Sequence, residues 1–121
     1  MSEMYVTITR SNACEEPFPF KIGCLLRCEK EPDNPHDSDA IRCSMPVVGT
    51  IGYVSNSAGD VAGGTMSAGR IYDRVEKKFY VRVLFTTPSI IICRVEDSEP
   101  SELKEEMLRQ FDDAWDSAPE I

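Results

Sequence analysis

The chain has 121 residues, 41% of them hydrophobic, and carries 21 acidic against 13 basic side chains, a formal net charge of −8. A chain of this length forms one domain around one core and has no room for a second, enzyme-sized lobe. No apolar stretch approaches the roughly 20 residues of a membrane span, and the first residues lack the basic and apolar regions of a signal peptide. We therefore expect a soluble, cytoplasmic protein that does not contact a membrane.

Six short segments rich in β-branched and aromatic residues predict strands at the spacing of a sandwich or barrel. They cover residues 5–9, 24–28, 40–43, 50–54, 79–85 and 90–95. The small and polar segment 55–64 predicts one or two helical turns, which begin at a serine and end at glycines. The expected fold is mainly β, with one or two short helices.

The segment between the second and third predicted strands is the most distinctive part of the chain. It reads Glu31-Pro32-Asp33-Asn34-Pro35-His36-Asp37-Ser38-Asp39. Each proline fixes its own φ and restricts the residue before it, and Asn and Asp side chains bond to the nearby backbone. The composition predicts a rigid turn that presents His36 and Asp37 outward at a fixed angle.

Five cysteines are present, an odd number, and most of them lie in apolar segments that predict strands: Cys14, Cys24, Cys28, Cys43 and Cys93. This pattern favours reduced thiols used as small hydrophobic residues over a disulfide framework. Along a strand, Cys24 and Cys28 would be about 13 Å apart. A zinc ion with bonds of about 2.3 Å cannot join them, so we expect no metal and no other cofactor.

Residues 96–121 form an acidic C-terminal tail, with ten acidic and two basic side chains, whereas residues 1–95 are balanced at eleven of each. Apolar side chains in the tail recur at helical spacing, which predicts an amphipathic helix after the barrel domain of residues 1–95. Two interpretations stay open. The helix docks on the barrel, or it binds a protein partner or a second copy through Leu103, Met107, Phe111 and Trp115.

The motif Glu31-Pro32-Asp33-Asn34-Pro35-x-Asp37, followed by Asp39-Ala40-Ile41 and Ile51-Gly52-Tyr53-Val54, resembles a HIRAN domain of the small, stand-alone bacterial type. The resemblance covers roughly residues 4–95. It implies a partly open β-barrel related to oligonucleotide-binding folds. In helicase-like members that act at stalled replication forks, this domain captures the 3′-hydroxyl end of single-stranded DNA.

The family's turn supplies an aromatic ring that stacks on a base and an aspartate that bonds the terminal hydroxyl, and these match His36 and Asp37. The family's aromatic pair after the first strand corresponds here to residues 13–16, which include two glutamates. A basic residue of the family corresponds to Ser55 or Asn56. The resemblance thus implies DNA-end recognition with less positive charge than usual, in DNA repair or processing.

We expect a nucleic-acid-binding module in which His36 stacks on a base, Asn34 and Asp37 hold a strand end, and Tyr53 stacks nearby. The candidate phosphate contacts are Lys30, Arg42, Arg70 and Arg74. The alternative is a protein-interaction or dimerisation module that uses the C-terminal helix and binds no DNA. The chain has no glycine-rich phosphate loop, paired-acid motif or triad signature, so we expect no enzyme activity.

Overall fold

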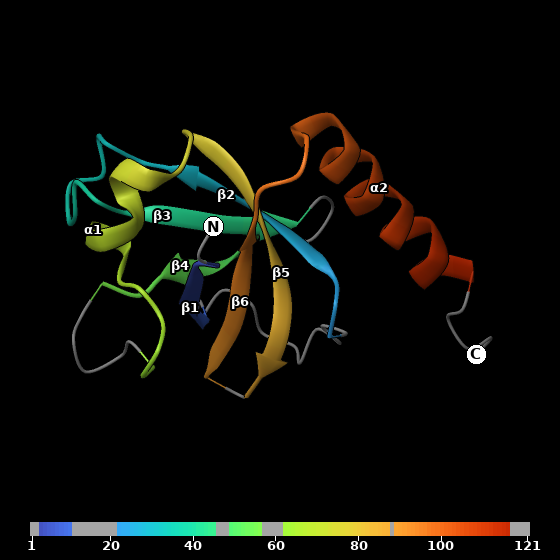
Figure 1. Cartoon of the computed structure of the whole chain (residues 1–121), viewed down its shortest axis with the longest axis horizontal. Helices are drawn as coiled ribbons and strands as arrows, with labels where there is room; N and C mark the ends of the chain where they lie inside the picture. The colour runs from blue at the N-terminus through green and yellow to red at the C-terminus, as the bar shows by residue number, and fades with distance from the viewer. Residues whose placement is uncertain (1–2, 11–21, 46–48, 57–61, 88, 117–121) are drawn as a thin grey trace.

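The computed structural model describes residues 3–10, 22–45, 49–56, 62–87 and 89–116, and it describes side chains as far as Arg109. Within these residues, six antiparallel strands form a closed barrel in the order β1-β4-β3-β2-β5-β6 (Figure 1). The strands are β1 Tyr5–Arg10, β2 Leu25–Lys30, β3 Ile41–Met45, β4 Gly49–Val54, β5 Lys78–Thr86 and β6 Ile90–Glu96. The predicted mainly β barrel is confirmed.

The barrel closes where β1 pairs with β6. Their register runs from Tyr5 opposite Arg94 to Thr9 opposite Ile90, so the first and last strands share a continuous ladder. The resemblance implied a partly open barrel, whereas hydrogen bonding here completes the ring. A closed ring satisfies the backbone groups that an open sheet would leave at its edges.

The core follows from alternation along each strand. In β3, Ile41, Cys43 and Met45 are buried and face inward, while Arg42 and Ser44 between them are partly exposed. The same alternation places Leu26 and Cys28 of β2 in the interior. Because side chains on a strand point to opposite faces in turn, one stretch of sequence builds both the core and the outer surface.

A short helix, α1 Ala68–Ile71, continues into a 3-10 turn at Tyr72–Arg74. The Ser67 side chain accepts a hydrogen bond from the Arg70 N–H and caps α1. The sequence did not predict α1, because four residues are too few to show helical periodicity. Residues 57–61 of the segment predicted to form helical turns, 55–64, lie outside the described residues; of the others, Ser55 and Asn56 are not helical, and Gly63 and Gly64 form a turn.

The C-terminal helix, α2 Pro100–Asp116, confirms the predicted amphipathic helix. Leu103 and Met107 are 4% and 2% exposed and pack on Leu25 of β2 and Tyr80 of β5, in a small cluster outside the barrel interior. Figure 1 shows α2 at one end of the molecule and the β2–β3 turn with α1 at the other. No helix in the described part of the chain is both long and apolar enough to cross a bilayer.

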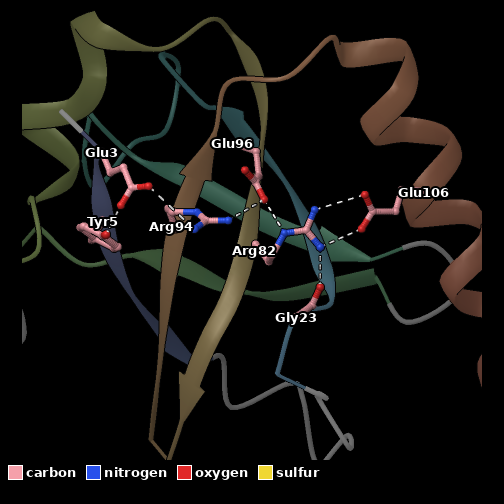
Figure 2. Close-up of polar contacts among 7 residues, drawn as sticks. All are labelled: Glu3, Tyr5, Gly23, Arg82, Arg94, Glu96 and Glu106. Atoms are coloured by element: carbon pink, nitrogen blue, oxygen red, sulfur yellow. Dashed lines mark hydrogen bonds and ion pairs between the residues drawn. The ribbon is translucent and has the colours of Figure 1, made fainter. Parts of the chain in front are cut away.

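An arginine on β5 also joins α2 to the barrel. Arg82 donates to both carboxylate oxygens of Glu106, at 2.7 and 3.2 Å, to the carbonyl of Gly23, and to Glu96 of β6 (Figure 2). Arg94 shares the Glu96 carboxylate. The bond to Glu106 is the main cause that raises the pKa of Arg82 and lowers that of Glu106. The helix is therefore held by a bidentate ion pair as well as by apolar contact.

Candidate functional site

Asn34 organises the turn between β2 and β3. Its side-chain oxygen accepts hydrogen bonds from the backbone N–H groups of His36, at 2.8 Å, and Asp37, at 3.2 Å. Asp37 repeats the pattern, since its Oδ1 accepts from the N–H of Asp39 at 2.9 Å. Asn and Asp favour such local bonds over helix or sheet. The turn leaves His36 exposed and Asp37 partly buried.

Asn56, just after β4, braces this turn against α1. Its Nδ2 donates to Asp37 Oδ2 at 3.1 Å, and its Oδ1 accepts from the N–H of Gly69 at 2.8 Å. A Cβ on Gly69 would lie 3.2 Å from Asn56 Oδ1 and 3.3 Å from Asp39 Oδ2, tighter than ordinary contact. Both oxygens of the Asp37 carboxylate are thus positioned by N–H donors, from two parts of the chain.

Glu31 connects the turn to the outer face of the barrel. Its carboxylate accepts from Asn34 Nδ2 at 3.1 Å and lies 3.5 Å from Arg42 Nε. Burial, and after it the interaction with this Glu31 carboxylate, raises the pKa of Tyr53. Tyr53 of β4 lies opposite Arg42 of β3 in the ladder. Tyr53 as a whole residue is 36% exposed.

The structure therefore brings Asn34, Asp37, Tyr53 and Arg42 into one connected network, and His36 is exposed on the same turn. Two members of the network, Glu31 and Asn56, were missed as site residues by the sequence reasoning. The sequence could have indicated Glu31, because this residue belongs to the motif that defines the turn. For Asn56 the sequence offered only the alignment of position 55 or 56 with the family's basic residue, and the hydrogen bonds themselves could not be foreseen because the two partners lie 19 and 13 residues away along the chain.

The four candidate phosphate contacts differ in their surroundings. Lys30 donates to the carbonyl of Val75 at 2.7 Å and stands 4.6 Å from the centre of the Tyr72 ring. Arg42 pairs with Glu29 as well as Glu31. Arg70 is exposed on α1, directly after the Gly69 N–H that bonds Asn56. Lys30 and Arg42 are thus engaged within the protein, whereas Arg70 lies in solvent next to the turn and Arg74 is exposed at the end of the 3-10 turn.

The predicted partner-binding residues of the tail are placed differently from one another. Leu103 and Met107 are buried against the protein's own barrel, while Leu108 is 48% exposed. Phe111 and Trp115 belong to α2, but their side chains lie outside the described ones. Leu103 and Met107 could contact a partner only after α2 leaves the barrel.

The fixed carboxylate of Asp37 is suited to accept a hydrogen bond from a hydroxyl group. A carboxylate offers about four lone-pair sites, and the two N–H donors from Asp39 and Asn56 occupy about half of them. The exposed imidazole of His36 is a flat ring on which a base can stack. Among the described residues, no group of three or more His, Cys, Asp or Glu is arranged to hold a metal ion.

Comparisons with models of protein families, with curated proteins and with solved structures found no match to this chain.

Proposed function

We propose that this protein binds single-stranded nucleic acid weakly at the β2–β3 turn and recognises a free 3′-hydroxyl end, as a HIRAN-like domain acting in the cytoplasm on DNA under repair or processing. The observation that carries the proposal is the pairing of exposed His36 with an Asp37 carboxylate fixed by Asn56 and by the Asp39 N–H. A stacking ring and an oriented acceptor stand next to each other on a braced turn.

The chemistry of the carboxylate separates a strand end from continuous strand. A terminal 3′-hydroxyl can donate to Asp37, whereas a 3′-phosphate has no such donor and is repelled by the negative charge. A hydrogen bond to a charged group contributes about 1.5–3 kcal/mol. This corresponds to a preference for the hydroxyl end of roughly tenfold or more.

The expected affinity is low because little positive charge is available near the turn. Lys30 and Arg42 already have partners, so the candidate contacts that remain exposed are Arg70, beside the Asn56 bridge, and Arg74. Phosphate neutralisation by Lys and Arg supplies much of the affinity of nucleic-acid-binding proteins. The acidic α2 lies at the opposite end of the molecule (Figure 1), and salt screens charges over about 8 Å at physiological ionic strength. Its repulsion should act on the turn mainly at low salt.

Two short fluorescent oligonucleotides of one sequence, one ending in a 3′-hydroxyl and one in a 3′-phosphate, test the proposal by anisotropy titration at low salt. We expect the wild-type protein to prefer the hydroxyl end by about tenfold or more. His36→Ala should weaken binding of both oligonucleotides to a similar extent, since the base stacks on the ring whichever end follows it. Equal binding of the two ends by the wild-type protein would refute end recognition.

Asp37→Asn should remove the preference for the hydroxyl end. The amide keeps an oxygen for the Asp39 N–H but loses the negative charge. The matched control is Asp33→Asn, which removes one charge from an exposed position on the same turn. If Asp33→Asn lowers the preference as much as Asp37→Asn does, general charge and not the positioned carboxylate explains the selectivity.

A further inference from the structure

Two buried cysteines face each other at the base of the hairpin that carries the turn. Cys28 of β2 and Cys43 of β3 are directly opposed in the ladder, and both are fully buried. Their Sγ atoms are 3.0 Å apart. Both thiols are reduced in this structure, as are those of Cys24 and Cys93.

The neighbouring backbone hydrogen bonds show whether Cys28 and Cys43 form a hydrogen-bonded or a non-hydrogen-bonded pair of the antiparallel ladder. The N–H of Glu31 bonds the carbonyl of Ala40 on the β3 side, whereas the N–H of Lys30 bonds the carbonyl of Lys77 on the β5 side. Backbone groups alternate in direction along a strand, so those of Cys28, like those of Lys30, point toward β5. Cys28 and Cys43 therefore form a non-hydrogen-bonded pair.

Opposed residues in a non-hydrogen-bonded pair have Cα atoms about 4.5 Å apart, and their side chains are closer than in a hydrogen-bonded pair. Disulfides span Cα separations of about 4.4–6.8 Å. The backbone thus already has a spacing that a disulfide accepts. A bond of about 2.05 Å requires the two sulfur atoms to approach by roughly 1 Å.

We propose that Cys28 and Cys43 are a redox modification site, at which a disulfide forms across β2 and β3 and closes a loop around the candidate binding turn. The loop comprises residues 29–42 and so contains Glu31, Asn34, His36 and Asp37. Oxidation would tie the two strands together on both sides of the turn. The disulfide would hold the turn in place covalently, whatever ligand the turn binds.

The oxidant we invoke is a small disulfide such as oxidised glutathione. One cysteine thiolate attacks a sulfur of glutathione disulfide, forming a mixed disulfide and releasing one glutathione. The second cysteine thiolate then attacks the protein-bound sulfur and releases the other glutathione. The two thiols lose two electrons and two protons in total, and the glutathione disulfide gains them.

The reaction should be slow in the folded protein. Burial is the largest cause that raises the pKa of the Cys43 thiol, and the hydrogen bond with Cys28 adds to it. The thiolate, which is the nucleophile, is therefore scarce at neutral pH. Access requires the hairpin to open locally, so oxidation should follow that opening and become faster as the pH rises.

The test brings the full-length protein to equilibrium in glutathione buffers that range from reduced to oxidised, followed by denaturation in an alkylating reagent. We expect two fewer thiols to be alkylated, and the protein mass measured before alkylation to be about 2 Da lower than that of the reduced protein. Peptide mapping should join Cys28 to Cys43. The oxidised protein should melt roughly 5–15 °C higher, as a loop of this length predicts.

Cys28→Ala and Cys43→Ala should each abolish the cross-link. The matched control is Cys93→Ala, because Cys93 is also fully buried in the same core but lies opposite Val6 and Val83. This variant should form the cross-link as the wild-type protein does. Because alanine variants in the core can fold poorly, the peptide map of the oxidised wild-type protein decides whether Cys28 and Cys43 are cross-linked. Retention of all thiols under oxidising conditions, or a cross-link at another pair, would overturn the proposal, and neither result depends on nucleic-acid binding.

Discussion

Replacing Gly52 with alanine should destabilise the barrel strongly. A Cβ at this position would lie 2.1 Å from the carbonyl oxygen of Thr9, 3.0 Å from the Thr9 carbonyl carbon and 3.2 Å from the Cα of Arg10. All three atoms belong to the backbone of β1, which pairs with β4 at this point. No rotation of a side chain relieves the overlap, so the two strands must separate by about 1 Å, given that real Cβ contacts lie beyond 3.0 Å.

The cost combines two contributions. Forcing an extra methyl group into a packed site costs about 1–3 kcal/mol, and it exceeds this when backbone has to move. Separation of β1 from β4 also weakens one or two ladder hydrogen bonds, at about 1 kcal/mol each. We therefore expect a loss of about 3–4 kcal/mol, a large part of the 5–15 kcal/mol by which typical domains are stable.

Thermal and urea unfolding, followed by circular dichroism, measure the effect. For a chain of 121 residues, a loss of this size lowers Tm by roughly 10 °C or more. The matched control is Gly63→Ala, because a Cβ on Gly63 would meet no atom within 4 Å. Its stability should stay within about 0.5 kcal/mol of the wild-type value. If Gly52→Ala and Gly63→Ala unfold at the same temperature and urea concentration, the close approach of β1 and β4 at Gly52 is wrong.

The remaining predictions concern the turn and the helix. Asn34→Ala should lower stability by about 1–2 kcal/mol in urea unfolding, because two backbone N–H groups lose their acceptor, whereas Asp33→Ala should change it by no more than about 0.5 kcal/mol; equal losses would contradict the role of Asn34. Glu106→Gln should speed hydrogen exchange in α2 more than Glu102→Gln does, since Glu106 is the carboxylate of α2 that pairs with Arg82 among the described residues; equal rates would argue against the ion pair as an anchor. Arg82 holds the pKa of Glu106 below 4.5, so the contribution of this pair is present above that pH and is lost as pH falls through the lowered pKa of the folded protein. The protection factors of the α2 amides, which correct exchange rates for their intrinsic pH dependence, should therefore fall at acidic pH in the wild-type protein, and a profile identical to that of Glu106→Gln would contradict this assignment.

The sequence by itself determined the strands and the turn between β2 and β3. Alternation of apolar and polar residues, as in 41–45, depends only on neighbours one and two residues away, so it can be followed along the chain. The two prolines and the Asn and Asp residues of 31–39 fix a turn by local geometry and by hydrogen bonds that span two or three residues. The apolar stripe that begins at Leu103 likewise predicted α2.

Only the tertiary structure decided which of these residues meet. Asn56 bonds Asp37 across 19 residues, and Cys28 lies beside Cys43 because the β2–β3 register places them opposite each other. The neutralisation of Arg42 by Glu31 depends on how the turn leaves β2. Contacts of this kind form when the barrel closes, and the closure is set by the packing of all six strands together. A local sequence pattern therefore does not predict which distant residue the closed barrel will place next to it.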